Sequence, residues 1–204
     1  MERGTLKLIA GNMFSNKTGT LIHRIETLRE FAHKKVLVMK PTTDTRSGSG
    51  KIKNSRGMKM DAVEIPTRNP KKMLEILRKE EAAKGISFDI VAIDEVQFFS
   101  PKIFGVVGEL LTRGYDVIAA GLMLNFRGEP FGSTLQLIGL CKSTNEIEML
   151  VSYCAKCGDR ADLPERLIDG KPAPYDSPIV LVGGKESYEA RCYACHELPG
   201  KPIF

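Results

Sequence analysis

Residues 6–21 read LKLIAGNMFSNKTGTL, and this stretch constrains the fold more than any other part of the 204-residue chain. Leu6, Leu8 and Ile9 form a short apolar run typical of a strand, the chain turns at Gly11, and apolar residues then recur at helical spacing. The segment GNMFSNKT nearly fits the phosphate-binding pattern G-x-x-x-x-G-K-S/T. In that pattern backbone N–H groups and a helix N-terminus surround the phosphates, lysine adds positive charge, and the hydroxyl binds Mg²⁺. The stretch therefore predicts a strand, a phosphate loop and a helix.

Asn16 is the mismatch to this pattern, whereas Gly11, Lys17 and Thr18 fit it. Glycine normally precedes the lysine because the backbone there takes a positive φ, and asparagine tolerates that region best among the other residues. The strain for a residue other than glycine is about 1 kcal/mol, so we expect the loop to form. From these residues alone, the alternative is an ordinary buried strand that leads through a polar turn into an amphipathic helix.

A second informative stretch, FDIVAIDEVQFFSP, occupies residues 88–101. Its continuous apolar run, 90–93, suits a strand buried on both faces, and Asp94 and Glu95 follow directly at the carboxyl end. Ligands of open α/β sheets bind at that end. Beside a phosphate loop, Asp94 can hold Mg²⁺, and Glu95 can orient or deprotonate an attacking hydroxyl. The alternative is a pair of exposed acids at a strand end.

Strands and helices alternate along the rest of the first three quarters of the chain. Apolar runs at 35–40 and 115–122 predict strands, and the patterns at 70–84 and 101–113 predict helices, as does the segment that runs through Leu140. This order predicts an α/β fold in which helices flank a mostly parallel sheet. An aromatic pair, Phe126 and Phe131, follows the last of these strands and can clamp a flat base or simply pack locally.

Residues 41–60 are rich in Gly, Ser, Thr and Lys and show almost no apolar periodicity, which predicts a mobile loop. Within it, Asp44, Arg46, Ser55 and Arg56 are candidates to meet an anionic ligand, because arginine binds phosphate through two parallel hydrogen bonds. The alternative is a flexible surface loop without a functional role.

Composition limits the class of protein. With 42% hydrophobic residues, the chain can bury a core for one domain and a small appendage. It contains no apolar run of membrane-spanning length, and its first residues do not resemble a secretory signal, so we expect a cytoplasmic protein with no membrane partner. The net charge of +5 is modest, and the basic residues are scattered rather than interleaved with aromatics, which makes nucleic acid an unlikely partner.

Two C-x₂-C pairs dominate the last quarter of the chain. In a cytoplasmic protein, Cys154, Cys157, Cys192 and Cys195 predict a four-thiolate Zn²⁺ site rather than disulfides. The long gap between the pairs leaves room for a loop. The alternatives are a redox pair or unmetallated thiols; His196 is a possible substitute for Cys195, and Cys141 is expected to be a small buried residue on its helix.

Together these motifs resemble the cellular-type (type II) thymidine kinases. The resemblance rests on the phosphate loop, Asp44-Thr45-Arg46, DEVQFF at 94–99, FRGEPFG at 126–132, CAKCG at 154–158, and the segment YDSPIVLVGGKESYEARC that ends at 192. It implies a P-loop (RecA-like) nucleotide-binding α/β domain at 1–148 and a zinc-ribbon-like domain at 149–204 that carries a nucleoside-covering lid loop. It further implies a homotetramer that uses ATP, Mg²⁺ and structural Zn²⁺ to make thymidine monophosphate for DNA synthesis, in nucleotide salvage.

The resemblance also implies roles for individual residues. ATP would be bound by Gly11, Asn12, Met13, Phe14, Ser15, Asn16, Lys17, Thr18, Asp94 and Gln97, of which Thr18 and Asp94 would also hold magnesium. Glu95 would be the general base for the 5′-hydroxyl, and Arg46 would stabilise the charge of the transferring phosphoryl group. The thymidine or related deoxynucleoside would be bound by Asp44, Phe98, Phe126, Pro164, Leu181 and Tyr188.

Some working positions depart from the family pattern. Asn12 and Asn16 stand where relatives usually have Pro and Gly, and Met123 and Asn125 stand where acids are common. Pro164 replaces a threonine that hydrogen-bonds the base, and proline can make no such bond through its side chain.

We therefore carry three hypotheses. The first is an ATP-dependent thymidine kinase. The second is a paralogue with an altered nucleoside specificity, and the third is a catalytically impaired nucleotide-binding protein of the same fold.

Overall fold

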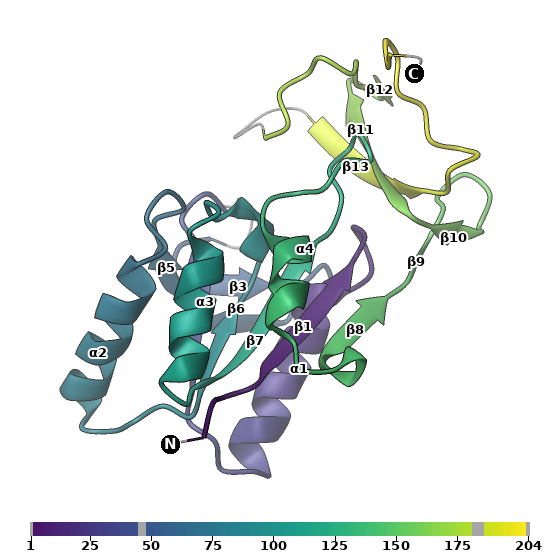
Figure 1. Cartoon of the computed structure of the whole chain (residues 1–204). Helices are drawn as coiled ribbons and strands as arrows, with labels where there is room; N and C mark the ends of the chain where they lie inside the picture. Colours follow the sequence, from purple (N-terminus) through teal and green to yellow (C-terminus); the bar gives the residue numbers. More distant parts are fainter. Residues whose placement is uncertain (1, 45–47, 181–185, 203–204) are drawn as a thin grey trace.

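A six-stranded sheet lies at the centre of the computed structural model, which describes residues 2–44, 48–180 and 186–202 (Figure 1). Its strand pairs are all parallel. In spatial order the strands are β5 (Val63–Ile65), β2 (Val36–Pro41), β6 (Ile90–Ile93), β7 (Asp116–Leu122), β1 (Leu6–Gly11) and β8 (Ile147–Leu150). Since the strands run the same way, their carboxyl ends meet at one edge of the sheet.

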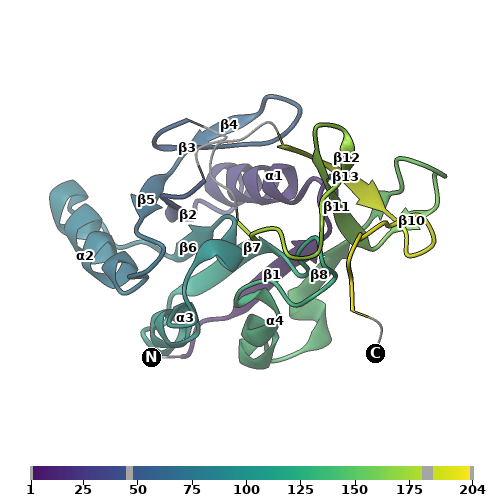
Figure 2. The same ribbon diagram turned by 90° about the horizontal axis from the view of Figure 1, so that it is seen from above.

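Helices cover both faces of this sheet (Figure 2). One face carries α1 (Lys17–Glu30), and the other carries α2 (Lys72–Lys84), α3 (Ile103–Thr112) and the short α4 (Thr134–Leu137). Three 3₁₀ helices lie in the connections: η1 (Val96–Phe98), η2 (Ile138–Leu140) and η3 (Thr144–Glu146). The predicted parallel sheet flanked by helices is confirmed, although α2 and α3 each begin two residues later than expected.

The strands bury both of their faces, which explains their continuous apolar runs. Successive residues of a strand point to opposite faces, so Val91 and Ile93 of β6 join the core under α2 and α3, and Ile90 and Ala92 join the core under α1. Leu8 and Ile9 of β1 divide in the same way. The four central strands thus form a largely buried layer, whereas the edge strands β5 and β8 are only partly buried.

The prediction of a structureless loop at 41–60 was wrong over part of its length. Two antiparallel strands, β3 (Lys51–Lys53) and β4 (Lys59–Asp61), form a hairpin there. Ile52 is fully buried with the apolar face of α1, and in Figure 2 the hairpin lies along α1 on the side away from the sheet. Each strand has a single inward-facing apolar residue, Ile52 or the partly buried Met60, which gives no apolar periodicity, so the sequence pattern did not reveal the hairpin.

The last quarter of the chain forms two small antiparallel sheets beyond the carboxyl edge of the large sheet (Figure 1). One pairs β9 (Ser152–Tyr153) with β10 (Arg160–Ala161), and the other contains β11 (Leu163–Ile168), β12 (Lys171–Pro172) and β13 (Glu186–Arg191). The large sheet keeps β8 through Leu150, so this strand spans the predicted domain boundary at 148/149. Among the described residues, no helix combines the length and apolar character needed to cross a membrane.

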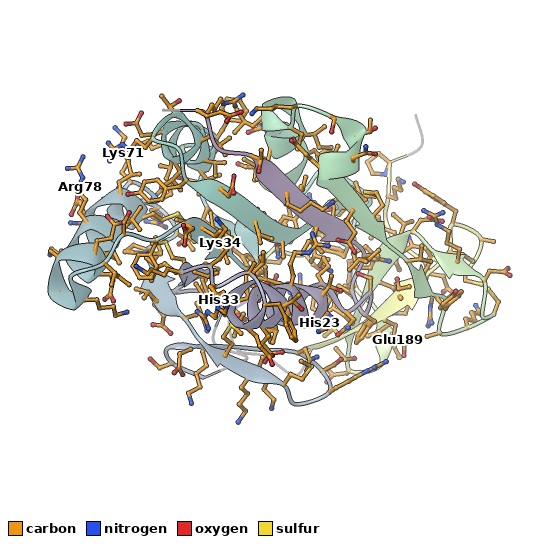
Figure 3. All side chains as sticks on the ribbon, turned by 90° about the horizontal axis from the view of Figure 1, so that it is seen from below. His23, His33, Lys34, Lys71, Arg78 and Glu189 are labelled. Atoms are coloured by element: carbon orange, nitrogen blue, oxygen red, sulfur yellow. The ribbon has the colours of Figure 1, made fainter. Side chains whose placement is uncertain are left out.

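The end of the molecule opposite this edge is seen in Figure 3. The exposed cations labelled in Figure 3 come from separate places in the chain: Lys71 precedes α2, Arg78 lies within it, and Lys34 follows α1. These side chains are spread over the surface and do not converge on a common point. The convergent charged groups lie at the other end, where the strands finish.

Truncating an apolar side chain in a strand that is buried on both faces should lower the free energy of unfolding more than truncating an exposed apolar side chain. Leu8 is 0% exposed, and we expect Leu8→Ala to lower the free energy of unfolding by about 2 to 5 kcal/mol because it leaves a cavity. Phe31 is 73% exposed, so Phe31→Ala serves as the control and should change it by about 0.5 kcal/mol or less. Urea denaturation followed by circular dichroism measures both, and equal losses would contradict the assignment of β1 to the core.

Candidate functional site

The connection between β1 and α1 forms the predicted phosphate loop. β1 ends at Gly11 and α1 begins at Lys17, so the helix N-terminus points at the loop. Asn16 adopts φ 63° and ψ 32°, the left-handed conformation that the sequence pattern requires before the lysine. Phe14 also has φ 63°. The strand, loop and helix are therefore present with asparagine in the position of the usual glycine.

Side chains within the loop hold it in shape. The backbone carbonyl of Asn12 accepts hydrogen bonds from the Ser15 hydroxyl at 2.8 Å and from the Lys17 ammonium at 2.6 Å. A Cβ atom on Gly11 would lie 2.6 Å from the carbonyl oxygen of Leu150 and 2.7 Å from the Ser15 hydroxyl, so only glycine fits there. The lysine is consequently directed back over the loop, where phosphate oxygens bind in this type of motif.

Asp94, at the end of β6, meets the first turn of α1. Although β7 lies between β1 and β6, the hydroxyl of Thr18 donates a hydrogen bond to Asp94 Oδ2 at 3.1 Å. Burial, together with the neighbouring charges of Glu95 and Asp44, raises the pKa of Asp94 to about 7, although the bond from Thr18 opposes this shift. A hydroxyl and a carboxylate at one point are the oxygen donors that Mg²⁺ prefers.

Glu95 is half-buried and is positioned by a residue whose role the sequence did not reveal. Its backbone is left-handed, with φ 50°, and its carboxylate accepts a hydrogen bond from the side-chain amide of Gln97. The other end of that amide accepts a hydrogen bond from the backbone N–H of Leu122, at the end of β7, at 3.0 Å. Gln97 is thus buried between Glu95 and β7, a position from which it orients the carboxylate.

These groups surround a pocket of about 330 Å³ at the carboxyl edge of the sheet. Five segments contribute its walls: the phosphate loop with the start of α1, the chain after β2, the end of β3 with the hairpin turn, the end of β6, and the end of β7. The lining residues include Asn16, Lys17, Thr18, Asp44, Lys53, Asn54, Ser55, Asp94 and Glu95. The structure therefore brings together the two motifs that the sequence placed in separate stretches.

Lys40 is a further functional candidate, and the sequence analysis missed it. Its side chain is fully buried at the end of β2, with its ammonium 3.7 Å from Asp44 and 3.9 Å from Glu64. It also donates hydrogen bonds to the carbonyls of Gly48 and Lys51 at 3.1 and 3.0 Å. Lys40 therefore fixes Asp44 and both ends of the segment that precedes the hairpin. The available signal was a lysine inside an apolar strand, which is rarely buried without partners.

The predicted nucleoside-binding residues divide into two groups. Phe126 is buried, and the guanidinium of Arg166 lies 5.2 Å from its ring centre and 5.9 Å from that of Tyr188. Phe98 lies instead edge-on to Phe131, with ring centres 5.6 Å apart. The structure thus joins Phe126 and Tyr188 through an arginine that the sequence analysis did not single out.

The remaining predicted residues of this group are less informative. Pro164 is buried in β11, where it pairs with Ala190 of β13. Arg46 and Leu181 lie outside the described residues.

The turn after β7 connects the two parts of the chain. The side-chain oxygen of Asn125 accepts hydrogen bonds from the backbone N–H groups of Arg127 and Glu129 at 2.8 and 3.1 Å, so Asn125 shapes the turn. Arg127 donates to the carbonyl of Ser177 at 3.0 Å and lies 4.6 Å from the ring centre of Tyr175. The phosphate-loop part and the small sheets are therefore in direct contact here.

The four predicted cysteines form one cluster, and their Sγ atoms all lie within 4.8 Å of one another. Cys157 and Cys192 Sγ are 3.6 Å apart, too far for a disulfide but close to the separation of about 3.8 Å that tetrahedral Zn–S bonds of about 2.3 Å require. The cluster is therefore suited to a zinc ion.

The two other residues considered with the cysteines lie elsewhere. The ring Nε2 of His196 is 3.0 Å from the carbonyl of Phe126, so this histidine faces the turn after β7. Cys141 was expected to be buried on its helix, but it is half-buried and follows the short η2.

Comparison with known proteins finds a family model and solved structures that match this chain. A family model described as thymidine kinase matches residues 4–196, nearly the whole chain. This match does not favour the alternatives of altered specificity or impaired catalysis. Among solved structures, the ATPase DotB of Legionella pneumophila aligns with 12% identity and a TM-score of 0.41 over 78% of this chain and 44% of DotB. The chain spans less than half of DotB, and a similarity at this level says nothing about function.

The raised pKa of Asp94 predicts a pH-dependent stability. Between the ordinary value of 3.8 and about 7, the folded state keeps a proton on Asp94 that the unfolded state has lost, so the free energy of unfolding falls as pH rises. We expect a slope of at most about 1.4 kcal/mol per pH unit from this group in Mg²⁺-free buffer, and none in Asp94→Asn. Urea denaturation from pH 5 to 8 gives the difference between the two proteins, and a flat difference would contradict a raised pKa.

The fifth cysteine supplies a matched control for the metal site. We expect the protein to carry one zinc ion per chain, Cys157→Ser to lose it, and Cys141→Ser to retain it, because only the former removes a thiolate of the cluster. Elemental analysis of the purified proteins measures the zinc content. Equal zinc loss in both variants, or its absence from the unaltered protein, would contradict the assignment.

Proposed function

Because the chain belongs to the thymidine kinase family, we propose that it transfers the γ-phosphoryl group of ATP to the 5′-hydroxyl of thymidine. The products are thymidine monophosphate and ADP. One observation carries this proposal: Lys17 and Thr18 of the phosphate loop share a single pocket with Asp94 and Glu95. Phosphoryl transfer needs little beyond groups that position the phosphates and a base that directs the nucleophile.

The phosphate loop and the N-terminus of α1 bind the ATP phosphates. Backbone N–H groups of the loop donate to the phosphate oxygens, and Lys17 moves from the Asn12 carbonyl to the charge of the phosphates. Thr18 and Asp94 are the residues that would hold Mg²⁺, which supplies positive charge beside the phosphate oxygens when it is bound with ATP. Ion binding keeps Asp94 in its charged form despite its burial, since a cation favours the carboxylate.

Glu95 acts as the general base. Its carboxylate lines the pocket and is held by the amide of Gln97, so it has a fixed direction. As the 5′-oxygen bonds to the γ-phosphorus and the bond to ADP breaks, the hydroxyl proton passes to this carboxylate. Gln97 is therefore a positioning residue for the base in this proposal, rather than a direct ligand of ATP.

The thymidine site lies at the turn after β7 and at strands β11 and β13 of the small sheets. Phe126 and Tyr188 supply ring surfaces, with Arg166 between them. Pro164 offers neither a hydroxyl nor an N–H group, so the polar groups of the base must be met by other residues. Arg46 is proposed to stabilise the transferring phosphoryl charge and Leu181 to contact the nucleoside.

The decisive test replaces the carboxylate of Glu95 by an amide of the same shape, which cannot act as a general base. We expect Glu95→Gln to lower kcat for thymidine by about 10²- to 10⁴-fold with little change in the KM for ATP, because general bases contribute on this order. Glu75→Gln, on the exposed side of α2, is the matched control and should leave kcat unchanged. Production of ADP coupled to thymidine monophosphate, followed in the presence of Mg²⁺, measures both values.

Two outcomes of the same assay would contradict the proposal. Turnover of deoxyuridine, deoxycytidine or purine deoxynucleosides without turnover of thymidine would assign a different base. A folded, zinc-loaded protein that binds ATP and phosphorylates no nucleoside would assign a binding function instead.

A further inference from the structure

The side chain of Asn16 needs space that a glycine at this position would not need, and Gly19 of α1 leaves that space open. In the phosphate-loop pattern the residue before the lysine is glycine, so the space around it is normally not filled by a side chain. The Asn16 side chain lies over Gly19, one turn into the helix. A Cβ atom on Gly19 would stand 2.2 Å from Asn16 Oδ1 and 2.6 Å from its Nδ2. Glycine within a helix lowers helix stability, so its presence here has a steric reason.

The amide of Asn16 reaches the hairpin from this position. Asn54 Nδ2 donates a long hydrogen bond of 3.4 Å to Asn16 Oδ1. The oxygen of the same Asn54 side chain accepts hydrogen bonds from the backbone N–H groups of Arg56 and Met58, at 3.0 and 2.9 Å, and so forms the turn between β3 and β4. Asn54 is only 6% exposed. The contact therefore joins the residue that shapes the phosphate loop to the residue that shapes the hairpin turn.

The hairpin forms the outer wall of the pocket. Ile52 packs β3 against α1, and Lys53 and Ser55, which follow it, line the pocket together with Lys17. Lys51 Nζ on the same strand lies 3.6 Å from an Asp61 carboxylate oxygen, whereas the ammonium of Lys53 has no hydrogen-bond or ion-pair partner among the described residues. A cation that faces a phosphate pocket without a protein partner is available to an anionic ligand.

We propose that Asn16 is a positioning residue that couples the phosphate loop to the β3–β4 hairpin, so that Lys53 faces the phosphates of the bound nucleotide. Gly19 is part of the same unit because it provides the space that the Asn16 side chain fills. The inference rests on the proposed function only in taking ATP as the ligand, and it assigns no residue to the chemical step.

A double-substitution cycle tests the steric half of the proposal. Gly19→Ala should displace the Asn16 side chain and weaken binding of a fluorescent ATP analogue by about 3-fold or more, as expected for residues in direct contact. Asn16→Gly should remove this penalty, so that Gly19→Ala in the Asn16→Gly background has no effect. Gly108→Ala is the matched control, since a Cβ on this glycine of α3 meets nothing within 4 Å. Additive effects of the two substitutions would overturn the proposal.

Hydrogen exchange tests the coupling to the hairpin. Asn16→Gly should raise amide exchange across residues 51–61, while exchange in β1 and β6 stays unchanged. Lys53→Met should weaken binding of the ATP analogue by about 3-fold or more in the original protein and by less in the Asn16→Gly background. Lys59→Met, on the exposed part of the hairpin, should leave the affinity unchanged.

These measurements separate the inference from the proposed function, because neither binding nor exchange requires turnover. Unchanged exchange in Asn16→Gly, or equal effects of Lys53→Met in both backgrounds, would overturn the coupling. If ATP-analogue binding and amide exchange change as expected in all variants but neither they nor the unaltered protein phosphorylates thymidine, the proposed function is contradicted and the coupling is supported.

Discussion

Burial of both faces of a parallel sheet is the constraint on which the rest of the structure depends. Because β1 and β6 have apolar neighbours on either side, the charged groups of the site lie where these strands end rather than along them. All strands run the same way, so those ends share one edge. This is how Thr18, which follows β1, lies 3.1 Å from Asp94, which follows β6, although a third strand separates them.

The same confinement makes the site electrostatically demanding. Asp94 is buried beside two other acids, and the result is a pKa of about 7 rather than 3.8. Asp44 is also a buried acid, but there the ammonium of Lys40 is buried beside the carboxylate and compensates its negative charge. A cation that binds together with ATP would compensate the negative charge of Asp94, as Lys40 compensates that of Asp44. The pocket is therefore arranged to receive positive charge at one side and phosphate at the other.

Sequence alone predicted the parts of this site that are local. The strand, loop and helix around Gly11, the left-handed Asn16 and the acids after β6 each follow from a continuous run of residues. It did not predict that Gln97 holds Glu95, because the second anchor of that amide is Leu122, which is 25 residues away and adjacent only through the strand order. The sequence did not predict the burial of Lys40 or the β3–β4 hairpin for a related reason, since both depend on partners in other segments.

The thiol cluster is connected to the proposed nucleoside site through adjacent residues in the chain. Cys195 is a member of the cluster, and the next residue, His196, contacts the Phe126 carbonyl at 3.0 Å. Any group that fixes the cluster also fixes this histidine, and with it the turn that carries Phe126. Since Arg166 of β11 lies against the same ring, the turn is held from two sides by the small sheets. A cluster remote from the phosphate loop can thus determine the position of the Phe126 ring, which is proposed to contact the nucleoside.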